Sequence, residues 1–163
     1  MNITNIIASR VRTAGTPFSN IATGKTFRLL QRKNSDQHYN ADSHSHAAVG
    51  ACICRLSDSQ LFFVTDKQST ATPVYTLIPV THTLTVNEDT TQYHAVLDSV
   101  SATDSPNPAG HPAKLEVFVF ALPSHAPVTI GDIITDTATG TRFRVRRVNA
   151  TETTLQRVES VPV

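Results

Sequence analysis

The stretch AKLEVFVFALPSHAPVTIGDIITDTATGTRFRVRRVNATETTLQRV, residues 113–158, decides the fold of this chain. Its first segment, 113–121, alternates between polar and apolar residues and then becomes apolar on both faces at Phe118–Phe120. This pattern predicts a strand in the middle of a sheet. Pro123 and Pro127 end the strand, because proline cannot donate a hydrogen bond to a neighbouring strand.

Three more strands are predicted in the same stretch. Residues 128–134 form the first and contain a Gly131-Asp132 step, in which Asp132 shapes the turn, and Thr139-Gly140 supplies a tight turn. Residues 142–148 then alternate between arginines and apolar side chains, and 153–158 returns as the last strand. The alternation places Arg142, Arg144 and Arg146 on one face, and Phe143 and Val145 on the other.

The composition fits a β-rich protein with wide polar loops. The chain has 163 residues, of which 39% are hydrophobic and 17% charged, and both fractions lie below the globular average. The charged fraction is too low for ordinary intrinsic disorder. We therefore expect a single β-rich domain over 1–163, with two polar stretches, 33–49 and 101–112, as flexible loops.

The first fifteen residues, 1–15, predict a short amphipathic helix over 2–13. Asn2 or Thr4 can cap its start and Gly15 follows its end. Its apolar face consists of Ile3, Ile6, Ile7 and Val11.

Between the helix and the last third, six further strands are predicted. They cover 24–32, 50–56, 61–65, 73–80, 83–86 and 92–100, with a hairpin across 57–60 and a turn at 87–89. The total of eight to ten short strands favours a small β-barrel or sandwich.

The overall charge is small, but the charges are sorted along the chain. The net charge is +1, whereas a surface that binds duplex DNA tightly normally shows a strong basic excess. Six basic residues and no acidic residue precede Asp36. Residues 56–113 contain six acidic residues and one Lys or Arg, which is Lys67. Such sorting favours contacts between copies of the chain. The alternative is a chance distribution of surface charge.

A cluster of histidines and cysteines offers a metal-site hypothesis. His44, His46, Cys52 and Cys54 lie close in sequence, and both sulfurs of a Cys-X-Cys strand project from one face. Structural zinc sites favour a Cys-X-X-Cys spacing, so the match is weak. The alternatives are small thiols in a core strand beside exposed loop histidines, or a Cys–His nucleophile pair that lacks any motif. No catalytic or cofactor-binding residue is predicted.

The arginine face of 142–148, extended by Arg147, has two interpretations. It contacts a phosphate backbone or an acidic partner surface, or it is a solvated strand face.

The beginning of the chain lacks the apolar core of a signal peptide, and no run has the length of a membrane span. Two cysteines do not make a disulfide framework, so we expect a protein made in a reducing cytoplasm without a membrane partner.

The two ends of the chain resemble the head–tail joining proteins of tailed bacteriophages, of the stopper or head-completion class. The resemblance lies in the opening helix with its Gly15 and Pro17 loop and a strand at 26–30. It lies also in the closing pattern over Gly131–Val158, where Gly-Asp-Ile-Ile, a turn and Arg-Phe-Arg-Val-Arg-Arg-Val follow one another. It covers about the first 30 and the last 45 residues, and 50–100 has no counterpart in it.

This resemblance implies a small β-barrel that assembles into a ring of six or twelve copies in the virion neck. Portal or adaptor proteins lie above such a ring and the tail lies below, and DNA passes transiently through the lumen. The work is mechanical, with no enzymatic step and no cofactor. One of the loops 33–49 and 101–112 closes the lumen or clamps a neighbour. Candidate interface or lumen residues are Arg10, Arg12, Arg142, Arg144 and Arg146.

Other classes stay open at this point. A tail terminator or another tail or baseplate protein is one of them. A monomeric binding module would use exposed aromatic side chains, and its tyrosines would be Tyr39, Tyr75 and Tyr93. A Cys/His metal-binding protein is another.

Overall fold

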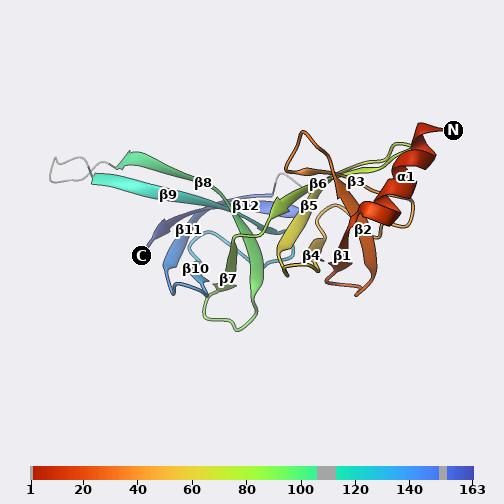
Figure 1. Ribbon diagram of the computed structural model, residues 1–163. Helices are drawn as coiled ribbons and strands as arrows, with labels where there is room; N and C mark the ends of the chain where they lie inside the picture. Colours follow the sequence, from red (N-terminus) through yellow and green to blue (C-terminus); the bar gives the residue numbers. More distant parts are fainter. Residues whose placement is uncertain (1, 106–112, 151–153) are drawn as a thin grey trace. The chain divides into compact units, whose positions relative to one another are not determined.

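The computed structural model describes residues 2–105, 113–150 and 154–163. Within these ranges the chain forms one helix and twelve strands, which confirms the predicted mainly β class with a short amino-terminal helix. The strands close into two six-stranded barrels, one in each of two compact units, Met1–Val80 and Thr81–Val163 (Figure 1). We expected one unit over 1–163. Two form because each set of six strands closes on itself and buries its own core.

The first unit contains the helix and a barrel with the strand order β1-β2-β3-β6-β5-β4, closed by pairing of β4 with β1. All neighbouring strands are antiparallel. The bounds are α1 (Ile3–Ala14), β1 (Thr16–Asn20), β2 (Thr26–Gln31), β3 (His38–Asn40), β4 (Cys52–Arg55), β5 (Leu61–Gln68) and β6 (Val74–Pro79).

Phe18 lies at the centre of the first core and comes from a strand that we had expected to be a loop. Its ring centroid lies 6.4 Å from that of Phe27, 5.9 Å from that of Tyr39 and 6.0 Å from that of Phe62. Aromatic contacts at these distances stabilise a core beyond the area that they bury. β1 therefore forms despite Pro17, because tertiary packing of Phe18 outweighs a weak local strand signal.

The helix begins and ends one residue later than the predicted 2–13, and the amino-terminal part of its apolar face is exposed. The side chain of Asn2 caps it by accepting a hydrogen bond from the N–H of Thr4. Val11 is fully buried, whereas Ile3 is 72% exposed and Ile6 is 40% exposed. The helix is held against the barrel near its carboxyl end, where the guanidinium of Arg28 donates to the carbonyl of Gly15.

The stretch 33–49 is not the flexible loop that we expected. It contains β3, and its side chains Ala41 and Ala47 belong to the first core. The buried hydroxyl of Tyr75 lies 3.2 Å from the carbonyl oxygens of both Ser45 and Ala47. Small apolar residues inside this polar stretch thus find places in the barrel, and a buried hydroxyl satisfies backbone acceptors there.

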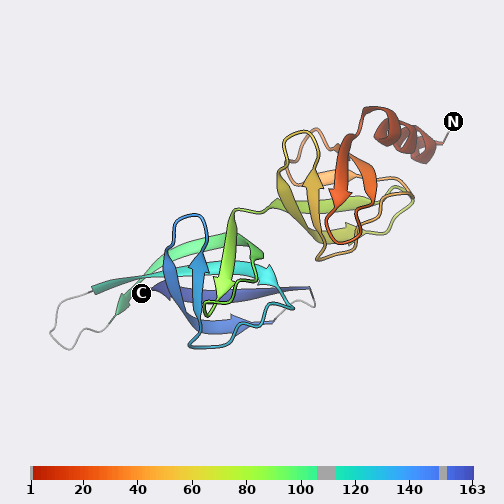
Figure 2. The same cartoon turned by 90° about the horizontal axis from the view of Figure 1, so that it is seen from below.

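The second unit is a barrel with the strand order β10-β11-β12-β9-β8-β7, closed by pairing of β7 with β10 (Figure 2). Its core is built around Phe120, Leu122, Ile134 and Val158. The bounds are β7 (His82–Val86), β8 (Tyr93–Ser105), β9 (Ala113–Pro123), β10 (Ile133–Asp136), β11 (Arg142–Asn149) and β12 (Leu155–Pro162). β9 lies between β8 and β12, as the sequence predicts for a strand that is apolar on both faces.

The expected strand over 128–134 is wrong for most of its length. Gly131 has φ +95°, in the left-handed region, and the carboxylate of Asp132 accepts hydrogen bonds from the backbone N–H and the hydroxyl of Thr129 at 2.7 and 2.9 Å. These contacts form a turn, so the strand starts only at Ile133. The predicted turn at Gly140 is confirmed, with φ +72°.

The first part of the predicted loop 101–112 is strand instead. β8 continues to Ser105 and stays paired with β9. β12, the other neighbour of β9, pairs with β9 only as far as Phe118. Residues 106–112 lie outside the described ranges. We call residues 99–105 of β8 and 113–117 of β9 the arm. It extends away from the second barrel in both overall views (Figures 1 and 2).

Candidate interaction surface

The arginines of β11 lie on the outside of the second barrel. Phe143 and Val145 are buried between them, as the alternation predicts. A β-bulge follows Val145, so Arg146 is an extra residue on its strand and both Arg146 and Arg147 point to solvent. The bulge therefore places two consecutive arginines on the outside of the barrel.

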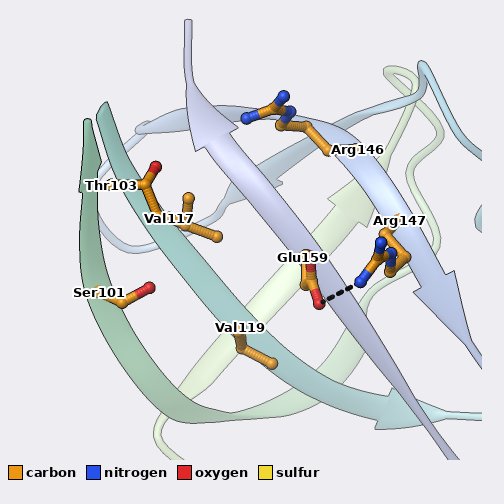
Figure 3. A pocket seen from close by; sticks show the side chains of 7 residues that line it. All are labelled: Ser101, Thr103, Val117, Val119, Arg146, Arg147 and Glu159. Carbon is orange, nitrogen blue, oxygen red and sulfur yellow. Dashed lines mark ion pairs between the residues drawn. The ribbon is translucent and has the colours of Figure 1, made fainter. Parts of the chain in front are cut away.

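These two arginines border a groove of about 370 Å³ (Figure 3). The arm supplies one side of the groove and β11 and β12 supply the other. Its lining consists of Ser101, Thr103, Val117, Val119, Arg146, Arg147 and Glu159. The volume falls in the range of protein ligand sites, roughly 300–1,000 Å³.

The groove combines an apolar part with hydroxyl and guanidinium groups, of which the hydroxyl of Thr103 donates to the carbonyl of Leu115 at 3.4 Å. Val117 and Val119 are half-buried, while the hydroxyl-bearing Ser101 and Thr103 are exposed. Arg147 is ion-paired with Glu159 at 3.7 Å, but Arg146 makes no ion pair with any described residue. An exposed pair such as Arg147–Glu159 contributes little to stability, on the order of 0–1 kcal/mol. The guanidinium of Arg146 is thus available to an added chain, and that of Arg147 becomes available when its weak ion pair opens.

The arm next to the groove has two unpaired edges. Within the described residues β7 pairs with β8 only at Tyr93–Ala95. The last contact on this side is the hydrogen bond that the N–H of Leu97 donates to the hydroxyl of Thr81. β12 leaves β9 after the pair of Ser160 with Phe118, and its next residues pair with β11. Backbone N–H and C=O groups therefore face outward on both sides of the arm.

Opposite charges face each other across the arm. Asp104 on β8 lies directly opposite Lys114 on β9, and both side chains are exposed. Ser101 lies opposite Val117 and Thr103 opposite Leu115 on the face that carries the groove. The arm thus has one charged face and one face of hydroxyl and aliphatic side chains.

The histidine and cysteine candidates do not form a metal site in the structure. No three His, Cys, Asp or Glu side chains come together among the described residues in a group that could hold an ion. His44 and His46 are exposed, whereas Cys52 and Cys54 are half-buried on β4. Burial, and to a lesser degree the neighbouring Cys54, raises the pKa of Cys52 to about 11. A thiol with this pKa is a poor nucleophile and a poor metal ligand at neutral pH.

The tyrosines do not form an exposed binding surface. Tyr39 and Tyr75 are buried in the first core, and Tyr93 packs against the second core. The arginine candidates are better placed for contacts. Arg10 and Arg12 are exposed on α1 in the first unit, and Arg142, Arg144 and Arg146 are exposed in the second unit.

Sequence reasoning found the arginines but missed the groove and the arm. No local signal marked the arm, because the predicted strands 92–100 and 113–121 are equally long and residues 101–105 are small or polar. The helix α1 is too short and too polar to cross a membrane, and the described residues contain no helix that could do so.

No protein-family model, curated protein or solved structure matches this chain.

Proposed function

We propose that this chain is a structural subunit of the neck of a tailed bacteriophage, where copies of it form a ring that joins the head to the tail. The observation that carries the proposal is the opposite net charge of the two compact units. The first unit has eight Lys and Arg and four Asp and Glu, which gives +4. The second has six and nine, which gives −3, and together they give the +1 of the whole chain.

Opposite charges on two separately folded units favour contacts between copies. The first unit of one copy attracts the second unit of the next, while like units repel. A contact between two different surfaces is heterologous, and repeated heterologous contacts close into a ring when the rotation between copies allows it. Charge sorting of this kind therefore supports self-assembly more than it supports a monomeric binding module.

The near-zero total charge supports a role in which DNA passes without being held. A protein that binds duplex DNA tightly neutralises many phosphates, and its affinity depends on those contacts. Here only five arginines lie in the strands of the second unit, and two of them, Arg147 and Arg157, are ion-paired with Glu159 and Asp98. Exposed arginines at a ring interface or lumen would guide a passing duplex rather than bind it strongly.

Infection with a phage in which the gene for this chain is interrupted tests the proposal. We expect heads and tails that form but do not join, and electron microscopy of the lysate measures their fractions. Supplying the intact chain in trans should restore complete particles. Normal virions in the absence of the chain would contradict the proposal, and joined particles with tails of uncontrolled length would assign the chain to tail termination instead.

A further inference from the structure

The arm is a two-stranded ribbon that extends past the last pairing partners of both its strands. Residues 99–105 are paired only with β9, and residues 113–117 are paired only with β8, within the described chain. A two-stranded ribbon is marginally stable on its own in water. Its open edges are also the surfaces to which a further strand most readily adds.

The two edges fit each other. Inside the arm, β8 and β9 are already paired in an antiparallel register that runs from Ser101 with Val117 to Ser105 with Ala113. The same two segments can pair again through their outer edges, provided that β8 comes from another copy. Each copy then offers one edge of each kind, which is the condition for a heterologous contact that repeats.

The charges of the arm support the same register between copies. In the repeated register, Asp104 of one copy lies beside Lys114 of the next, and Ala102 lies beside Glu116, the other charged side chain of this face. Opposite charges directly across an antiparallel pair stabilise it, and like charges destabilise it. On the other face, Ser101 of the added strand lies beside Val117 and near Arg146, which has no ion-pair partner among the described residues.

We propose that the β8 edge of one copy pairs with the β9 edge of the next, so that the arms form one continuous antiparallel sheet around the ring. The occupant of each open edge is therefore a second copy of this chain. The contact joins the second units of neighbouring copies through their backbone edges, and it acts beside the attraction between unlike units. It rests on the proposed function, because it assigns one further surface through which that ring assembles.

Charge exchange within the arm tests the contact. Asp104→Lys places two lysines opposite each other, both within an arm and between copies, and Lys114→Asp places two aspartates there. We expect each variant alone to associate about tenfold more weakly per contact than the wild type. A 1:1 mixture should recover association. When the two variants alternate around the assembly, every contact between copies brings a lysine of one variant beside an aspartate of the other.

The mixture separates association from folding. The repulsion within each arm persists in the mixture, so only pairing between copies can produce the recovery. The double variant Asp104→Lys/Lys114→Asp restores attraction at both places and should associate like the wild type. Circular dichroism of each variant checks that the barrels are folded, and mass photometry over a concentration series measures association.

Disulfide trapping gives a second readout that does not depend on charge. In a background with Cys52 and Cys54 replaced by serine, one chain carries Ser101→Cys and another carries Val117→Cys. Oxidation of the mixture should give covalent dimers of the two different chains, whereas Ile130→Cys, at a residue that is 70% exposed, should not trap with either partner.

The outcomes distinguish the arm contact from ring formation itself. If rings form equally well with wild type, single variants and mixture, and no mixed disulfide appears, the arm contact is wrong and the ring stands. If the wild type stays monomeric even beside portal and tail proteins, ring formation is wrong and the arm contact falls with it. Recovery in the mixture together with the mixed disulfide supports both.

Discussion

Asn87, in the turn after β7, is hydrogen-bonded to Asp132, in the turn before β10. The amide nitrogen of Asn87 donates to the carboxylate at 2.7 Å, and its amide oxygen accepts from the N–H of Ile133 at 2.9 Å. One side chain thus links two turns that are 45 residues apart in sequence. Asn87 has φ +49°, a left-handed conformation that asparagine tolerates better than most residues.

Replacing Asn87 by alanine should destabilise the second unit by about 1–2 kcal/mol, because two hydrogen bonds are lost and alanine is strained at positive φ. Chemical denaturation of the full chain measures the change. Glu88→Ala is the control for side-chain truncation in the same turn, since Glu88 has φ +65° and alanine is no more strained there than glutamate. Equal losses in the two variants would show that the Asn87 contacts contribute nothing.

Asp132 gives a pH dependence of known sign. The hydrogen bond from Asn87, followed by that from the N–H of Thr129, lowers the pKa of Asp132 below its usual range. A lowered folded-state pKa stabilises the protein above the unfolded pKa of about 4, and this stabilisation is lost as the pH falls through the folded value. Asp132→Asn should therefore reduce stability at pH 7, and the difference from wild type should shrink toward pH 2–3. A difference independent of pH would contradict this assignment.

The hydroxyl of Tyr75 should matter for the first unit. Tyr75→Phe leaves the buried carbonyl groups of Ser45 and Ala47 without this donor, and we expect a loss of about 1–3 kcal/mol. Tyr93→Phe is the control, because Tyr93 packs against His125 and its hydroxyl makes no hydrogen bond with a described residue. Thermal unfolding of both variants makes the comparison, and a Tyr75→Phe variant as stable as Tyr93→Phe would refute this role.

Cys52 should react slowly with thiol reagents. Its pKa of about 11, against an ordinary value of 9.0, leaves about a hundredfold less thiolate at neutral pH. In a Cys54→Ser variant, the alkylation rate of Cys52 should rise steadily from pH 8 to above pH 10. A rate that is already at its plateau at pH 8 would reveal an activated thiol and would reopen the nucleophile hypothesis.

Local pattern predicted much of the second barrel. Phe143 and Val145 alternate with arginines, and Gly140 supplies a left-handed turn residue, so β11 and its preceding turn follow from sequence spacing. β1 could not be predicted, because it is short, contains Pro17 and depends on packing of Phe18 in the core. The division into two units depends on the pairing of β1 with β4 and of β7 with β10, which join residues far apart in the chain.

The candidate surface was only half visible in the sequence. The arginines of β11 stand out as a periodic run, and their exposure follows from the apolar residues between them. Ser101 and Thr103 carry no such signal, because they join the groove only once β8 has paired with β9 beyond the barrel. Edges of this kind are defined by where neighbouring strands stop, which no local pattern records.

The assembly state of the chain beside its proposed partners tests the central claim most directly. Native mass spectrometry of the full chain, alone and with the portal and tail proteins that the proposal names as its partners, gives the mass of each complex. We predict rings on the portal that contain many copies of the 17.7 kDa chain, with six copies adding about 106 kDa. A chain that stays at 17.7 kDa in every mixture would contradict the account.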